Sequence, residues 1–149
     1  MIDKNTTIKK QAERLHKKVR TFILTCVADD GYPLTKAVVP GKHREAIGEL
    51  YFCTNTSSNF IGAIGKNGKG SVYFYRKVFF NWKGCNLKGH FEVVNNITLK
   101  QKYWIDFYKN AYPQKSYTDP DFCLIRFTPS SGRFYANFRV NDFTIKAGE

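Results

Sequence analysis

Short runs of β-branched and aromatic residues, separated by turn-forming residues, recur along most of this chain. Residues 21–28 (TFILTCVA) are followed by Asp-Asp-Gly and then by residues 34–39 (LTKAVV), a pattern typical of a β-hairpin. Further strands are predicted over residues 49–54, 71–77, 82–94, 122–127, 133–137 and 143–145. The series predicts a mainly β fold, a closed antiparallel barrel of about six strands.

Three segments have features of helices rather than strands. In the first, apolar residues recur at helical spacing on a face formed by Ile8, Ala12, Leu15 and Val19. This pattern predicts a helix over residues 7–19, capped by Thr6 or Thr7. Further helices are predicted over residues 60–66 and 97–109. We therefore expect one domain, residues 1–149, with two or three helices covering a barrel.

The chain is strongly basic, with a net charge of +12 over 149 residues. Such a charge favours partners that carry phosphate: nucleic acid, an anionic membrane or a phosphorylated cofactor. A basic barrel that binds single-stranded nucleic acid is one alternative, although the aromatic residues lie in strand patterns typical of a core. The basic first helix is short and lacks a large apolar anchor at its start, so we expect no membrane partner. We do not favour nucleic acid, because no RNP-type motif appears in the sequence.

The cysteines and the N-terminal segment point to a reducing compartment. Cysteines at positions 26, 53, 85 and 123 lack the paired spacing of a zinc site, so no metal centre is predicted. Cys26, Cys53 and Cys123 lie in apolar runs, which predicts buried free thiols. The N-terminus is charged where a signal peptide is apolar, and no apolar run reaches transmembrane length. These features predict a cytoplasmic protein.

Catalytic motifs are not recognisable among the polar residues. The three histidines have no serine–acid or cysteine–acid partners at the spacing of a hydrolase triad. Asp119-Pro120-Asp121 is interpreted as a turn, since Asp-Pro pairs commonly begin turns.

The segment 51–59 (YFCTNTSSN) is the most informative for function. It is an apolar strand that passes through polar residues into a predicted helix, where backbone amides carry partial positive charge and suit a phosphate. An ordinary helix cap is the alternative. Lys36, within the apolar strand 34–39, either faces solvent or serves an anionic ligand. If that strand paired with strand 49–54, Lys36 would lie near the polar segment.

Five segments together resemble the FMN-binding split barrels of the pyridoxamine 5'-phosphate oxidase-like family, especially small general-stress and nitroimidazole-resistance-type flavoproteins. They are FILTCVADDGYPLTKAV, LYFCTNTSS, SVYFY, WKGCNLKGHFEVV and TDPDFCLIRFTP, within residues 8–145. The resemblance implies a six-stranded antiparallel split barrel and a homodimer with FMN at its interface. It also implies a flavin-dependent oxidoreductase that acts on a small-molecule redox substrate. A noncatalytic protein that binds flavin, deazaflavin or haem is the alternative.

The resemblance also implies FMN-binding positions in this sequence. Lys36 would reach the phosphate or ribityl chain, and Ala37 and Val38 would offer backbone contacts to the isoalloxazine. The residues expected to line the flavin are Phe52, Cys53 and Thr54. The expected phosphate segment is Thr56, Ser57, Ser58 and Asn59. The residues expected near the ring edge are Lys83 and Gly84, and those expected to close the groove from a partner subunit are Phe134, Tyr135 and Phe138.

Two departures from the family pattern affect what the site can bind. The family usually has a basic residue directly after the two serines, where this chain has Asn59 and then Phe60. One charge partner of the phosphate is then missing, so either FMN binds more weakly or Lys66 or Lys69 substitutes for it. The C-terminal segment also lacks the arginine- and histidine-bearing motif of the true oxidase, so vitamin B6 oxidation is not expected.

Overall fold

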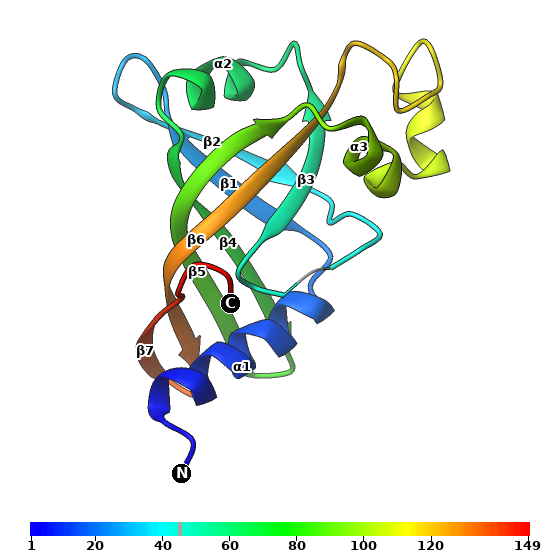
Figure 1. Ribbon diagram of the computed structural model, residues 1–149. Coiled ribbons are helices and arrows are strands. Elements are labelled where there is room, and N and C mark those ends of the chain that lie inside the picture. Colours follow the sequence, from blue (N-terminus) through cyan, green and yellow to red (C-terminus); the bar gives the residue numbers. More distant parts are fainter. Residues whose placement is uncertain (45) are drawn as a thin grey trace.

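The computed structural model describes residues 1–44 and 46–149, which contain seven strands, three α-helices and one 3-10 helix (Figure 1). The strands are β1 (Phe22–Val27), β2 (Pro33–Val38), β3 (Leu50–Asn55), β4 (Lys69–Val78), β5 (Asn81–Val94), β6 (Phe122–Ala136) and β7 (Arg139–Thr144). The helices are α1 (Lys4–Lys18), α2 (Asn59–Lys66), α3 (Ile97–Tyr103) and the 3-10 helix η1 (Asp106–Asn110). The mainly β fold is confirmed, with seven strands in place of six.

The strands form one antiparallel sheet in the order β2-β1-β4-β5-β6-β3, with β7 on the far part of β6. The two predicted strands 122–127 and 133–137 are one strand of 15 residues. Because β6 is so long, its first part pairs with β3 while its second part pairs with β7. The expected closed barrel is therefore wrong: in the described residues β2 and β3 end the sheet and are not paired with each other.

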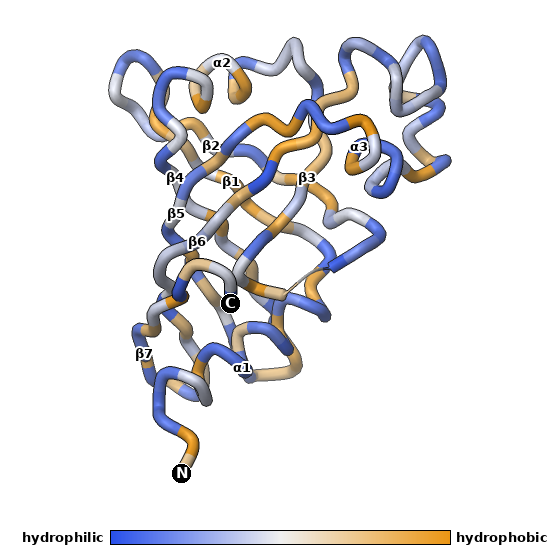
Figure 2. Tube along the Cα trace, viewed as in Figure 1, coloured by the Kyte–Doolittle hydropathy of each residue, from blue (hydrophilic) through white to orange (hydrophobic). Residues whose placement is uncertain are grey.

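Apolar side chains from the strands and from helices α1 and α2 fill the space inside the curved sheet. Figure 2 shows hydrophobic residues along the strands and hydrophilic ones in the loop after α3. The predicted face of α1 is confirmed, because Ile8, Ala12, Leu15 and Val19 are all buried. The cap of α1 is Asp3, whose carboxylate accepts from the Thr6 amide, so helix α1 begins earlier than predicted. In Figure 1, α1 covers the lower end of the barrel and α2 the upper end.

Glycines allow two of the backbone features that the sequence suggested. Gly31 has a φ of 82° in the predicted Asp-Asp-Gly turn between β1 and β2, a conformation that a side chain disfavours. Gly89 lies at the bulge where β5 changes register against β6. A Cβ at Gly89 would lie 2.2 Å from the Thr128 carbonyl oxygen. Any larger residue at position 89 would therefore force these two strands apart.

The predicted helix over residues 97–109 is correct only in its first part. Helix α3 ends at Tyr103, and Trp104 has an extended backbone with φ −66° and ψ 136°. The Trp104 ring packs edge-on against Phe122 of β6, with ring centroids 5.1 Å apart. This side chain packs against the sheet where the helix ends, and most of the rest of the predicted range lies in the 3-10 helix η1.

Candidate functional site

The split between β2 and β3 is bridged by one lysine side chain. Lys36 of β2 donates a hydrogen bond from Nζ to Thr54 Oγ1 of β3, and Nζ lies 3.5 Å from Ser58 Oγ. It also lies 5.8 Å from the centre of the Phe60 ring. Although β2 and β3 do not pair, the curvature of the sheet brings Lys36 to the polar segment. The expected proximity is therefore confirmed, although the strand pairing assumed for it is wrong.

Lys36 has no acidic partner among the described residues. Its neighbours are two hydroxyl groups and an aromatic ring, and burial lowers the pKa of its ammonium group. A partly buried charge held only by neutral groups is costly unless an anion completes its surroundings. The ammonium has three N–H donors, so hydrogen bonds to Thr54 and Ser58 leave one for a ligand.

Thr54 and Ser58 are themselves fixed by the fold. Thr54 is buried on β3, and its carbonyl oxygen accepts a hydrogen bond of 2.8 Å from the Tyr112 hydroxyl. Ser58 is the cap of α2, where its Oγ accepts from the Phe60 amide. Both hydroxyls therefore have set positions beside Nζ of Lys36, and together they form a compact polar group at the open side of the barrel.

Three of the four amides of the expected phosphate segment, those of Thr56, Ser57 and Ser58, are already hydrogen-bonded within the protein. The Thr56 amide donates to the Asp121 carbonyl, and the Ser57 amide donates to the Asp121 carboxylate at 2.8 Å. The Ser58 amide donates to the Asn55 carbonyl. Asp121 also accepts from the Asn55 side chain, and these hydrogen bonds lower the pKa of its carboxyl group. A phosphate is therefore favoured at the Lys36–Ser58 end, away from this carboxylate.

Asp121 and Tyr112 are the structural residues of the site that sequence reasoning did not identify. Asp119-Pro120-Asp121 is a turn, as predicted, with the Asp121 amide bonded to the buried Asp119 carboxylate. Its second role, holding the segment after β3, depends on a contact across 64 positions in sequence. The only local sign was the clustering of acidic residues just before a strand.

The remaining residues of β2 and β3 that were expected at the site have different environments. β2 pairs only with β1 in the described sheet, so the amide and carbonyl of every second residue face an open edge, and only one of the neighbours Ala37 and Val38 can present its backbone there. Phe52 is fully buried in the core, with its side chain away from solvent. Cys53 is half-buried rather than buried, and burial among neighbouring groups raises the pKa of its thiol to about 12. A thiol of that pKa remains protonated and is not a nucleophile at neutral pH.

Lys83 and Gly84 lie in another part of the same subunit. The pairing registers place Lys36 in one row with Leu87 of β5. Lys83 is therefore about 13 Å along the strand and about 14 Å across the sheet from Lys36, at standard strand spacings. A Cβ at Gly84 would lie 2.7 Å from the Tyr73 hydroxyl, so the backbone is closely approached there. Within one subunit the structure does not bring these two residues to Lys36.

The start of α2 carries no cation of its own. Asn59 is the first residue of α2 and is exposed. Of the two lysines considered as substitutes, Lys66 forms an ion pair with Asp29 in the β1–β2 turn. Lys69 is the first residue of β4, and its backbone lies opposite His90 of β5 in the sheet. Lys36 is therefore the cation whose ammonium contacts the cap of α2 in the described structure.

Other classes of site receive no support from the described residues. They include no group of three or more His, Cys, Asp or Glu side chains arranged to hold a metal ion. They also include no helix of the length and apolarity needed to cross a membrane. His16 is buried between Phe22 and Phe74, and burial lowers its pKa to about 4. A histidine in that position has no path to a ligand and acts as part of the core.

Solved structures with this fold include three informative neighbours. A protein from Clostridium acetobutylicum related to general stress protein 26 of B. subtilis, of the pyridoxinephosphate oxidase family, is 26% identical, with a TM-score of 0.81 and coverage of 97% of each chain. General Stress Protein 26 from Bacillus anthracis str. Sterne is 22% identical, with a TM-score of 0.76 and coverage of 93% of this chain and 98% of that one. A heme binding protein from Mycobacterium smegmatis is 14% identical, with a TM-score of 0.74 and coverage of 92% and 57%.

The comparison with family sequences decides membership. A search of curated proteins finds no match. The family described as pyridoxamine 5'-phosphate oxidase like matches residues 7–146, which include every strand and the polar group around Lys36. This match covers far more than half of the sequence, and the neighbours share the split-barrel fold. The chain therefore belongs to the pyridoxamine 5'-phosphate oxidase-like family.

Proposed function

We propose that this protein binds FMN and acts as a flavin-dependent oxidoreductase on a small-molecule substrate. The observation that carries the proposal is the Lys36 ammonium, held by Thr54 and Ser58 without an acidic partner in the described residues. A phosphate dianion would complete its surroundings with a charge-assisted hydrogen bond. Family membership over residues 7–146 supports flavin as the molecule that carries this phosphate.

The residues present fit FMN at one end of the expected site better than at the other. Lys36 and Ser58 would hold the phosphate, and the open edge of β2 around Ala37 and Val38 would offer one amide and one carbonyl to the ring. The Thr56 and Ser57 amides are occupied by Asp121, so they would contribute little. Bound FMN would supply reversible hydride and electron transfer, while the chain positions the ring and excludes water.

A homodimer with FMN at its interface is part of the proposal. The tips of the β4–β5 and β6–β7 hairpins expose Phe79, Phe80 and Phe138 at 89%, 98% and 90%. The pairing of Lys83 with Ala136, and of Ala136 with Arg139, places these tips side by side. Monomers rarely expose so many neighbouring aromatic rings, and pairing of two copies is a common way to cover them.

Titration of FMN into the purified protein tests the proposal directly. We expect quenching of FMN fluorescence and a bound flavin absorption spectrum. The absence of binding at tens of micromolar FMN would contradict it. The M. smegmatis neighbour binds heme, so haemin is the parallel titration. A Soret band with haemin and no response to FMN would instead favour the noncatalytic haem-binding alternative.

A further inference from the structure

A second candidate site lies at the opposite end of the barrel from α2. A cleft of about 630 Å³ separates α1 from the β4–β5 hairpin and the end of β6. Figure 1 shows α1 across the lower end of the barrel and α2, whose cap Ser58 contacts Lys36, at the upper end. The volume lies in the range of pockets that bind small molecules.

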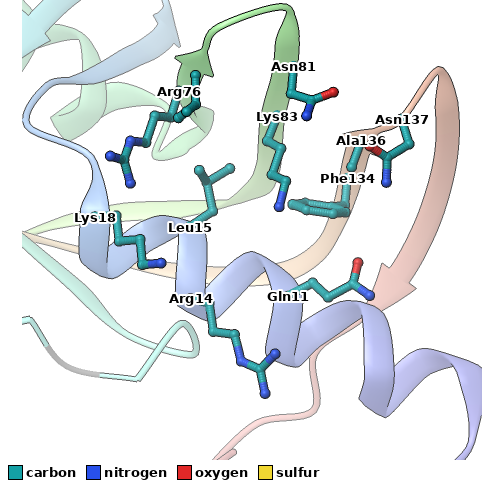
Figure 3. Close-up of a pocket in the computed structure, with 11 residues that line it drawn as sticks. Gln11, Arg14, Leu15, Lys18, Arg76, Asn81, Lys83, Phe134, Ala136 and Asn137 are labelled. Carbon is teal, nitrogen blue, oxygen red and sulfur yellow. The ribbon is translucent and has the colours of Figure 1, made fainter.

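Four cations from two separate elements line this cleft. Arg14 and Lys18 come from α1, whereas Arg76 and Lys83 come from β4 and β5. In Figure 3, Lys18 extends on the side of Arg76, Lys83 descends beside Phe134, and Arg14 lies at the lower rim. No acidic side chain is among the lining residues, and the other polar side chains there are carboxamides.

These four cations differ from five other basic residues, which are ion-paired in the described structure. Lys66, Arg126 and Arg133 each form an ion pair with an acidic side chain. Within residues 1–44 and 46–149, none of the four cleft cations has such a pair. Like charges gathered around one concave surface repel each other and produce a positive potential that attracts anions.

The base of the cleft is apolar. Leu15 and Phe134 line it and are themselves buried, at 5% and 3% exposure. Apolar area framed by a few polar or charged groups is typical of a small-molecule site, since the apolar part supplies affinity and the charges fix orientation. We propose that this cleft binds a small organic polyanion, a phosphorylated compound with at least two negative charges and an aromatic or apolar group that rests on the apolar lining formed by Leu15, Val78 and Phe134.

Calorimetric titration with three probes tests this assignment. ATP carries both features of the ligand class, tripolyphosphate carries only the charge, and adenosine carries only the ring. We expect ATP to bind, tripolyphosphate to bind more weakly, and adenosine to show no measurable heat. The affinity for ATP should decrease as salt rises, because the cations are exposed to solvent.

The chain offers matched controls for two of the three cleft cations that are not implicated in the FMN site, Lys18 and Arg76. Lys18→Gln and Arg76→Gln should each weaken ATP binding by about three- to tenfold, as expected for partly screened charge-assisted contacts. Lys17→Gln and Lys77→Gln remove the same charge from adjacent exposed positions that do not line the cleft. These two controls should leave ATP binding within about twofold of wild type.

Three results would overturn the inference. The first is no binding of ATP at millimolar concentration, and the second is an equal loss of affinity in the Lys17→Gln and Lys77→Gln controls. The third is stronger binding of a single-stranded oligonucleotide that depends on the same residues.

FMN titration separates this inference from the proposed function. If the affinity for FMN fell in Arg76→Gln but not in Lys36→Ala, the cleft would be the cofactor site. Failure of FMN to bind while ATP follows the expected pattern would refute only the proposed function.

Discussion

The environment of Lys36 shows that residue type alone does not determine whether a lysine faces solvent or can bind an anion. A lysine within a strand often faces solvent, but the Lys36 ammonium is partly buried beside two hydroxyls and an aromatic ring. Burial lowers its pKa, which shows that the charged form is less well solvated than in water. An anionic ligand would restore that solvation, so the residue is suited to binding.

Replacement of Lys36 should weaken FMN binding more than replacement of Ser58. A charge-assisted hydrogen bond contributes roughly 1.5–3 kcal/mol and a neutral one about 0.5–1.5 kcal/mol. We therefore expect Lys36→Ala to raise the Kd for FMN by about 10- to 150-fold and Ser58→Ala by at most about tenfold. Fluorescence titration measures both, with Lys77→Ala as an exposed strand lysine for control. Unchanged affinity in both variants would show that the phosphate lies elsewhere.

His16 should make the stability of the protein depend on pH. Burial lowers its pKa from 6.5 to about 4, and its Nδ1 has no hydrogen-bond partner in the described structure. The unfolded chain therefore binds a proton at a higher pH than the folded chain, and stability falls as pH decreases from 6.5 to 4. The loss from this group amounts to about 3 kcal/mol.

Denaturant unfolding at several pH values measures this effect. His16→Leu should remove most of the dependence between pH 6.5 and 4, because leucine keeps an apolar side chain in the core and cannot take up a proton. At pH 7 the variant should be at least as stable as wild type, since it removes an unpaired buried nitrogen. An identical pH dependence in wild type and His16→Leu would assign the effect to other groups.

Among the elements, α2 decides how firmly an anion can be held beside Lys36. Its first residue is Asn59, and its cap Ser58 also faces Lys36. The partial positive charge at a helix start favours a phosphate. The Asp121 carboxylate, fixed by the Ser57 amide, opposes it from the preceding segment. The element is therefore a weaker phosphate site than one with a cation at its first position.

A cation at the start of α2 should strengthen FMN binding. Asn59→Lys places an ammonium at an exposed position beside the proposed phosphate, which should contribute on the order of 1 kcal/mol, or about fivefold in Kd. The gain should shrink as salt concentration rises. Titrations at low and high salt test both expectations. If Asn59→Lys abolished binding, Asn59 would itself make a specific contact, or the anionic end of the ligand would lie elsewhere.

At the scale of the whole molecule, the proposed FMN residues belong to two regions of one subunit. The Lys36 group lies at the split between β2 and β3. Lys83 and Gly84 lie on β5, which is three strands away from β2 across the sheet. A single groove can include both sets only if a second copy contributes one of them. The exposed aromatic rings at the hairpin tips supply a surface on which such pairing can occur.

The protein should sediment as a dimer at micromolar concentration. Phe80→Ser should weaken the dimer by about 30-fold or more, the typical effect of truncating a central aromatic residue at an interface. Phe107→Ser is the matched control, because Phe107 is also exposed but lies in η1, away from the hairpin tips. Wild type that remains monomeric, or an equal effect of both substitutions, would contradict the proposed interface.

The sequence by itself determined the features that depend on near neighbours. Strand β1, the Asp-Asp-Gly turn and the apolar face of α1 agree with the structure, because alternation, turn chemistry and helical spacing are local properties. Lys36 was also identified as a candidate, since a charge within an apolar strand is conspicuous, and the structure places it beside Thr54 and Ser58. Family resemblance ordered these pieces into a split barrel.

Only the tertiary structure decided which distant segments meet. Hydrophobic patterning does not specify a strand's partner, so the pairing of β3 with β6, and the open edge it leaves at β2, followed from the whole sheet. The same holds for Asp121, which occupies an amide expected to bind phosphate, and for the cations that α1 and the β4–β5 hairpin bring to one cleft. Contacts between segments far apart in sequence form only when the chain closes around its core, and for that reason local patterns do not contain them.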